Sequence, residues 1–428
     1  MLYFPSKRRI SALKKTVFIL LLSLFFASSC AHAEITSKRK ATVGTFGTAS
    51  FLTLYDDFAK PQRLSAYDDI WSEIKALMAE TDELLSTSIE TSEIARFNRL
   101  KSGESMPISP LTAEVFQLAL DMNRKTNGYF NPAVFPLVDL WGFSPRFLGN
   151  ISAPAQPYDR ALKNGMRSAP DEAYITAFLQ LADLSGIQLD GDAAHGYMLT
   201  KVTPSVWVNG EEYQAQIDLG GIAKGYVVDR IAAILREAGY TSGYFSCGSS
   251  SIGFLKNTSA SALEIGDSAF TLAIRSPRKT DSGADSFASL RVKDIMLSSS
   301  GDYENNYVVN GQLCCHIINP FTGYPLNYSD NAVQKGICTI TLLSGSAVED
   351  DALTTSLCLM GPAKALDYFN THLKDHRIVM TLYRTDRNTY EVLTNLTSDE
   401  IHFTDSAYSL ACTVDESGNL VYTGDFFR

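Results

Sequence analysis

Residues 217–226 read IDLGGIAKGY, and within this stretch the pattern of the chain changes from strand to helix. The run that precedes the glycines, from Trp207 to Ile217, is typical of a strand. After the glycines, apolar residues recur at helical spacing up to Gly239, which predicts a helix that stops there. The apolar positions of that helix are Val227, Val228, Ile231 and Leu235.

The glycine turn is a candidate anion site. Two glycines at the start of a helix leave backbone N–H groups unpaired, and the helix dipole adds positive potential at the same place. Such a turn suits a pyrophosphate. Lys224 would add a point charge, and Asp218 would accept from a sugar or a ring N–H. The alternative is an ordinary tight turn in which Lys224 is solvated and Asp218 is a cap.

A second candidate lies in EDDALTT, residues 349–355. On a helix, Asp351 and Thr355 stand one turn apart, so their oxygen atoms share a face. A carboxylate and a hydroxyl, with backbone and phosphate oxygens nearby, are the hard ligands that Mg²⁺ prefers. The alternative is that the acidic residues only complement the positive end of the helix dipole.

A third candidate is His316, which precedes the turn TGYP at residues 322–325. A histidine beside a turn is suited to act as a general base near neutral pH. The alternative is a histidine with a purely structural role. The polar segment at residues 298–303, SSSGDY, is either a ligand contact or a plain loop.

Elsewhere the pattern mixes strands and helices without strict alternation, which predicts an α+β fold. We expect a first strand at 42–54, helices at 69–85 and from Ser109-Pro110 to Gly128, a surface excursion at 144–172, helices at 348–360 and 362–373 on either side of Gly361, and strands with turns at 377–428.

The N-terminus has the features of an export signal. Five basic residues precede a short apolar run from Val17 to Ala27, which is too short to span a bilayer comfortably and is followed by small residues. The sequence around Cys30 loosely resembles a lipobox, which would attach a lipid to that cysteine. Alternatively, Ala31-His32-Ala33 fits ordinary cleavage. We therefore expect a signal peptide at 1–33 and a protein on the extracytoplasmic or periplasmic face, lipid-anchored to the membrane if Cys30 is modified.

Composition narrows the classes of function. The chain has 428 residues, 45% of them hydrophobic and 20% charged, as in a soluble globular protein. The net charge is −10, and residues 1–33 hold five basic and no acidic side chains, so the remainder is more acidic still. Such a surface argues against nucleic-acid binding. The six cysteines after Cys30 lie mostly in apolar stretches, which favours buried thiols over a disulfide framework or a zinc site.

Several short sequence blocks, when taken together and in order, resemble a known family. No single block would be specific enough for this. The blocks are FNPAV at 130–134, PLVDLWGF at 136–143, IDLGGIAKGY at 217–226, SGDY at 300–303, HIINPFTGYP at 316–325 and DALTT at 351–355. Together they resemble the FAD:protein FMN transferase (ApbE) family, from about residue 43 to residue 376. The resemblance implies a flavin transferase domain at 34–376, with 377–428 as a strand-rich extension of the same domain.

The resemblance also implies a fold and a site. The fold would be two-lobed, with mixed sheets, helices packed on them, and FAD in a cleft between the lobes. The metal would be held by Asp351, Thr355 and the backbone carbonyl of Gly221, and His316 would lie close to the reacting phosphate. The residues implied to contact FAD are Phe46, Ser88, Tyr129, Phe130, Asn131, Asp218 and Lys224. Three of these depart from the family's usual residue, which is often tyrosine at Ser88, aspartate at Asn131 and methionine at Phe46.

The activity implied is Mg²⁺-dependent transfer of FMN from FAD to a Thr or Ser hydroxyl of a target protein, with release of AMP. The usual targets in the family are flavin-bearing subunits of membrane or extracellular redox enzymes. Two alternatives remain open at this point. One is an FAD pyrophosphatase, in which water replaces the protein hydroxyl, and the other is a non-enzymatic FAD-binding lipoprotein.

Overall fold

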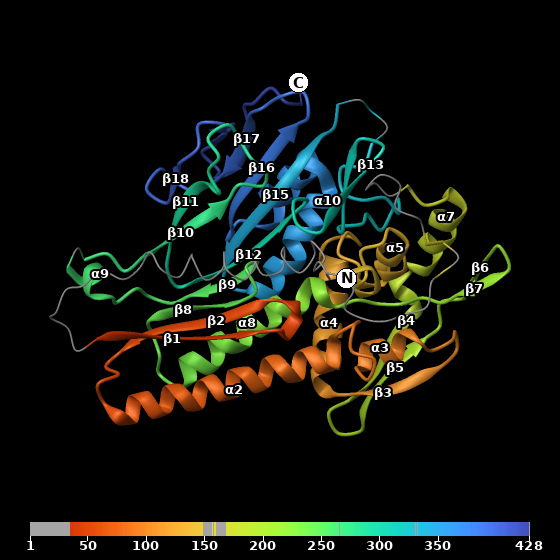
Figure 1. Ribbon diagram of the computed structural model, residues 1–428, viewed down its shortest axis with the longest axis horizontal. Helices are drawn as coiled ribbons and strands as arrows, with labels where there is room; N and C mark the ends of the chain where they lie inside the picture. Colours follow the sequence, from red (N-terminus) through yellow and green to blue (C-terminus); the bar gives the residue numbers. More distant parts are fainter. Residues whose placement is uncertain are drawn as a thin grey trace, which may run out of the picture.

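A computed structural model describes residues 35–148, 156, 158–159, 168–264, 266–329, 331 and 333–427 (Figure 1). Its main feature is a nine-stranded sheet. In order across the sheet, the strands are β1 (Thr36–Val43), β2 (Ala49–Asp56), β8 (Gly243–Cys247), β9 (Ser251–Phe254), β12 (Ile295–Gly301), β15 (Lys335–Ser344), β16 (Arg377–Arg384), β17 (Tyr390–Thr394) and β19 (Tyr408–Leu410). Neighbours run antiparallel except β17 and β19, which are parallel.

Two helices, α8 (Gly220–Glu237) and α10 (Ala347–His372), cover one face of this sheet. A third, α2 (Pro61–Leu85), packs on α8 and runs along the lower edge of the molecule in Figure 1. The central strand β15 is buried along nearly all of its length because both of its faces are covered. Ile340 and Leu342 join the core under the helices, whereas Cys338 and Leu343 join the core on the opposite face.

That opposite face is covered by a small sheet of β10 (Phe270–Arg275), β11 (Ser286–Val292) and β18 (Ile401–Phe403). The other strands form a sheet of β3 (Ser105–Ile108), β5 (Gly196–Lys201) and β4 (Ile187–Asp192), and three pairs: β6 (Val206–Val208) with β7 (Glu211–Tyr213), β13 (Asn306–Val309) with β14 (Gln312–Cys315), and β20 (Cys412–Val414) with β21 (Leu420–Tyr422).

The remaining helices are short, apart from α4, and most of them lie near the β3–β5–β4 sheet and the β6–β7 pair (Figure 1). They are η1 (Thr45–Gly47), α3 (Glu93–Asn98), α4 (Pro110–Lys125), η2 (Pro132–Val134), α5 (Phe135–Leu140), α6 (Pro145–Leu148), α7 (Glu172–Leu181), η3 (Leu184–Gly186) and α9 (Ala260–Glu264).

The structure confirms the mixed α+β class and most of the predicted helices. Helix α4 begins as its sequence predicts, since Pro110 takes the first position and the Ser109 hydroxyl accepts from the N–H of Thr112 at 3.3 Å. The break predicted at Gly361 is present inside α10, where that glycine has φ 73° and ψ 166°. Strands after residue 377 form one side of the nine-stranded sheet.

Two strand predictions were wrong. The expected strand at 42–54 is two antiparallel strands, β1 and β2, because Gly44 and Gly47 adopt positive φ and reverse the chain between them. The expected strand from Trp207 to Ile217 is the hairpin β6–β7 followed by extended chain, because Asn209 and Gly210 both have positive φ and form its turn.

The signal peptide and the Cys30 anchor lie outside the described residues, as does part of the expected surface excursion at 144–172. Within the described residues, no helix has the length and apolar character needed to cross a membrane.

Candidate functional site

The site is organised by the crossing of α8 and α10. Gly225 lies where the two helices meet, and a Cβ at this position would come within 2.2 Å of the backbone oxygen of Ala347. Only glycine therefore permits the observed approach. The close crossing brings the first turn of α8 against the first turns of α10 and so joins two of the three candidate segments.

Each helix contributes a carboxylate to the other's backbone. Asp229 of α8 accepts from the N–H groups of Ala347 and Val348, at 2.8 and 3.1 Å, and so caps α10. In return, Asp351 Oδ2 accepts from the N–H of Gly225 at 2.7 Å, while its Oδ1 accepts from the Ser251 hydroxyl at 2.7 Å. The Asp351 carboxylate is therefore buried and fixed in orientation by both oxygens.

The other two predicted metal donors, Gly221 and Thr355, lie on the two helices that meet at this carboxylate. Gly221 precedes Gly225 by four residues, so the Asp351 oxygen that accepts the Gly225 N–H is bound about one helical turn from Gly221. The Thr355 hydroxyl donates to the Asp351 carbonyl at 3.3 Å and lies 3.1 Å from the Ser300 hydroxyl. We call Gly221, Asp351 and Thr355, with Ser251 and Ser300, the oxygen cluster.

The oxygen cluster fits the chemistry of Mg²⁺. All of its members present oxygen, and each Asp351 oxygen is engaged by one hydrogen bond in the structure, which leaves a lone pair for a cation. In the part of the chain that the structure describes, no three His, Cys, Asp or Glu side chains meet as a metal cluster. The predicted donor set is of a different kind, because it combines one such side chain, Asp351, with the Thr355 hydroxyl and the Gly221 carbonyl.

The glycine turn is held from both sides. Asn98, buried at the end of α3, pairs with Ile217 through two hydrogen bonds of 2.8 Å, one to its N–H and one to its carbonyl. The N–H of Asp218 donates to the Pro132 carbonyl at 2.9 Å. Asp218 Oδ1 in turn accepts from the N–H of Gly220 at 2.8 Å, which closes a turn just before α8, whose N-cap position is Leu219.

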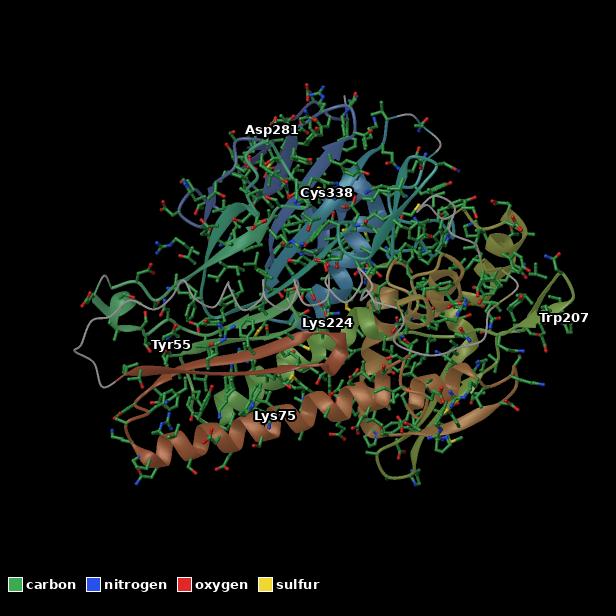
Figure 2. All side chains as sticks on the ribbon, viewed as in Figure 1. Tyr55, Lys75, Trp207, Lys224, Asp281 and Cys338 are labelled. Carbon is green, nitrogen blue, oxygen red and sulfur yellow. The ribbon has the colours of Figure 1, made fainter. Side chains whose placement is uncertain are left out.

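Lys224 supplies the positive charge of the turn. Its ammonium donates to the Gly220 carbonyl at 3.2 Å, and no carboxylate of the described residues forms an ion pair with it. Burial raises the pKa of Asp218, while the Gly220 N–H and the Lys224 charge act in the opposite direction. Figure 2 shows Lys224 near the middle of the molecule. The half-exposed ammonium is thus available to an anion.

The loop at residues 129–131 lies against the same turn. Phe130 is buried, and its ring would be 3.3 Å from a Cβ placed on Gly221. The ring of Tyr129 stands edge-on to that of Phe321, with 4.9 Å between centroids. Asn131 is occupied by backbone, since it accepts from the Ala133 N–H and donates to the Ala182 carbonyl, at 2.9 and 2.8 Å. Its polar atoms hold the loop in place.

His316 follows β14, and its backbone N–H donates to the Asn305 carbonyl at 3.1 Å. Its Nδ1 is buried and has no hydrogen-bond partner among the described residues. Burial, with a smaller contribution from the nearby Lys224 charge, lowers the pKa of His316 to about 4. The imidazole is therefore neutral at pH 7 and has a free ring nitrogen, which is the form a general base requires.

Phe46 and Ser88 lie near the C-terminal end of α2. Phe46 has φ 54°, and its N–H donates to Asp82 Oδ2 at 3.1 Å. A Cβ on Gly248 would lie 3.1 Å from Thr48 and 3.7 Å from the Lys224 side chain, so the η1 turn that contains Phe46 ends near Lys224. Ser88 bonds to Ser86, and among the described residues no hydrogen bond joins it to another predicted site residue.

The sequence reasoning missed three positions that arrange this site: Asn98, Asp229 and Ser251. Asn98 ends the segment 92–98, which resembles an N-terminal block of the family, but its role was not predicted, and Asp229 and Ser251 lie in no such block. Each acts on backbone or on another side chain across the fold. The segment SGDY was also only partly understood. Its Ser300 is in β12 and joins the oxygen cluster, whereas Asp302 is buried in a two-pronged ion pair with Arg278, with both contacts at 2.7 Å.

The known proteins to which this chain is similar carry related names, as FAD:protein FMN transferases or as ApbE proteins. The chain is 26% identical over 335 residues to "FAD:protein FMN transferase" of Escherichia coli (strain K12), covering 78% of this chain and 81% of that protein. Its fold is similar to that of flavin transferase ApbE from Vibrio cholerae, with a TM-score of 0.60, 22% identity, and coverage of 87% of this chain and 98% of the other.

A second solved structure, the apo form of the Pseudomonas stutzeri flavinyl transferase ApbE, has a TM-score of 0.61 and 20% identity, and the match covers 82% of this chain and 94% of that one. The model of the ApbE family matches residues 46–380, which is well over half of the sequence. The chain therefore belongs to the ApbE family.

Proposed function

We propose that this ApbE-family transferase moves FMN from FAD to a Thr or Ser hydroxyl of an acceptor protein, with release of AMP and with dependence on Mg²⁺. The observation that carries the proposal is the position of the Asp351 carboxylate. It accepts from the Gly225 N–H at 2.7 Å, within the first two turns of α8, so a candidate metal donor lies beside the helix start that carries the candidate anion site.

In the reaction, the acceptor oxygen attacks the phosphorus on the FMN side of the pyrophosphate. The P–O bond to AMP breaks, the acceptor proton is lost, and a phosphoester joins FMN to the protein. Mg²⁺ bound by Asp351, Thr355 and the Gly221 carbonyl would neutralise charge on the pyrophosphate and on the departing AMP. Lys224 contributes a second positive charge at the same turn.

His316 takes the proton in this proposal. The neutral imidazole has an unpartnered Nδ1 and lies within the electrostatic reach of Lys224. A base with a pKa of about 4 is weak, but the negative phosphates of bound FAD would raise that pKa toward neutrality. Asp218 and the loop at 129–131 would orient the flavin nucleotide beside the turn.

We also propose that the protein is exported and works outside the cytoplasm, anchored by a lipid if Cys30 is modified. The basic segment and the apolar run from Val17 to Ala27 support this location. The acceptors would then be extracytoplasmic flavin-bearing subunits of membrane or extracellular redox enzymes.

The test is incubation of the purified protein with FAD, Mg²⁺ and an acceptor domain from a flavin-bearing redox subunit, followed by intact-mass spectrometry. We expect an FMN-sized increase in the acceptor mass that requires both FAD and Mg²⁺. Rapid AMP release that acceptor does not change would instead identify an FAD pyrophosphatase. FAD binding without AMP release or transfer would identify a flavin-binding protein.

A further inference from the structure

Lys201 is an unusual feature of the region beside the site. It lies in β5 with none of its side chain exposed, and no carboxylate of the described residues forms an ion pair with it. The Glu104 charge acts on the ammonium from a distance, and the ring of Phe97 lies 5.0 Å from it. Because a buried ammonium without a direct ion pair is costly, its hydrogen bonds identify its role. It donates to the carbonyls of Leu100 and Asn98, at 2.7 and 3.3 Å, at the C-terminal end of α3.

These contacts place a positive charge at the negative end of a helix and satisfy carbonyls that the helix leaves unpaired. Burial lowers the pKa of Lys201 to about 8, so the ammonium is still largely protonated at neutral pH. The main chain of Asn98 is thereby fixed from the side of β5. Its side chain is fixed by the two hydrogen bonds to Ile217.

Ile217 immediately precedes Asp218, and the N–H of Asp218 donates to the Pro132 carbonyl at 2.9 Å. The segment that supplies Asp218 and Lys224 is thus aligned by Asn98 on one residue and by the 129–132 loop on the next. A shift of Ile217 would move Asp218 and the glycine turn together, because the two residues are adjacent in the chain.

We propose that Asn98 is a positioning residue for the FAD-binding turn and that Lys201 acts through it. This inference rests on the proposed flavin transfer and deepens it. Neither side chain is placed in contact with FAD, since both are buried and both bond to backbone. Their effect should therefore fall on the binding of FAD more than on the chemical step.

The experiment measures KM for FAD and kcat for FMN transfer with the full protein. Asn98→Ala should raise KM about tenfold, as expected when the two hydrogen bonds that align the turn are lost, and should change kcat less than about twofold. Asn98→Asp keeps the acceptor for the Ile217 N–H and should fall between wild type and Asn98→Ala. Gln214→Ala is the matched control, because its amide also accepts from backbone across the same region, from Ser102 at 3.0 Å, but at the surface.

A double-mutant cycle separates positioning from general stability. Lys201→Met should raise KM several-fold in the wild-type background and add almost nothing in the Asn98→Ala background, because both changes act on one element. Independent structural damage would instead give additive effects. If Asn98→Ala does not fold, the cycle is run with Asn98→Asp.

Two results would overturn the inference. One is an unchanged KM in the folded Asn98 variants, and the other is additivity of the Lys201 and Asn98 effects. Either would leave the proposed flavin transfer intact. A wild-type protein that neither binds nor cleaves FAD would overturn the proposed function, and the positioning role with it.

Discussion

The two sides of the candidate site are built differently. In the oxygen cluster, both Asp351 oxygens accept short hydrogen bonds, Thr355 bonds to the helix and to Ser300, and a glycine crossing holds the helices together. On the other side, His316 keeps an unpartnered ring nitrogen among the described residues, and Phe321 is 55% exposed. The side chains of the oxygen cluster are held by hydrogen bonds within the protein. The His316 side instead presents an unpartnered nitrogen and an exposed ring that are available to substrate and acceptor.

Substitutions on the two sides should therefore have different effects. A residue of the oxygen cluster is held by several partners, so its substitution changes charge or packing that the structure depends on. A residue on the His316 side has fewer partners to lose, so its substitution should change the reaction more than the stability of the fold.

Asp351→Asn should lower FMN transfer by about a thousandfold, because it removes the only charged metal donor while nearly preserving shape. Intact-mass spectrometry of the acceptor gives the rate. The matched control is Asp375→Asn, an exposed carboxylate just beyond the end of α10, which should leave the rate unchanged. A fully active Asp351→Asn protein would contradict a metal-binding role.

Gly225→Ala should destabilise the protein by about 3 kcal/mol, because the new Cβ meets the Ala347 oxygen and forces α8 from α10. The free energy of unfolding in urea checks this. Gly345→Ala is the control, since a Cβ there meets nothing within 4 Å. Equal stabilities for the two variants would mean that the helix crossing is not rigid.

His316→Asn should lower transfer about a hundredfold, the usual contribution of a general base, and should change the unfolding free energy at pH 7.5 by less than about 1 kcal/mol. Rate and stability are measured on the same preparation. If the variant loses enough stability to explain the lower rate, His316 has a structural role like the residues of the oxygen cluster. The two sides of the site would then not differ in the way described above.

The pKa of His316 predicts a pH dependence of stability. The pKa is about 4 in the folded protein and about 6.5 when unfolded, so between these values the unfolded state binds more protons. The stabilisation is present above pH 6.5 and is lost as the pH falls toward 4. Wild type should lose about 2 kcal/mol more than His316→Asn over this window, as measured by urea unfolding at each pH. Parallel curves would contradict the buried, neutral imidazole.

Ser251→Ala should have the smallest effect, about a tenfold weaker apparent Mg²⁺ affinity, because it removes one hydrogen bond that orients Asp351. Titration of transfer activity with Mg²⁺ measures this, and saturating Mg²⁺ should restore the rate. Ser261→Ala, on an exposed serine of α9, is the control. If high Mg²⁺ does not restore the rate, Ser251 has a role other than orienting the ligand.

Much of the local structure could be predicted because it depends on neighbours in the chain. The Ser109-Pro110 helix start, the glycine entry into α8 and the break at Gly361 each follow from the conformations that proline and glycine favour. The errors had the same local origin. Positive φ at Asn209, which is not a glycine, turned an expected strand into a hairpin.

The candidate site was predictable as a set of segments but not as an arrangement. Asp351 and Thr355 could be paired from their spacing on one helix. The roles of Asp229, Ser251 and Asn98 could not be found, because their partners lie about 100 or more residues away along the chain. No periodicity records a hydrogen bond between such distant positions.

The α+β class, the chemical types available for anion and metal binding, and the order of the motifs all follow from the amino-acid sequence. Tertiary packing was needed to bring the Asp351 carboxylate to α8, to pair Asp302 with Arg278, and to join Asn98 to Ile217. The two kinds of information differ in the distance along the chain over which their causes act. Backbone preference and side-chain spacing act over a few residues, whereas packing and burial bring together groups that no local rule relates.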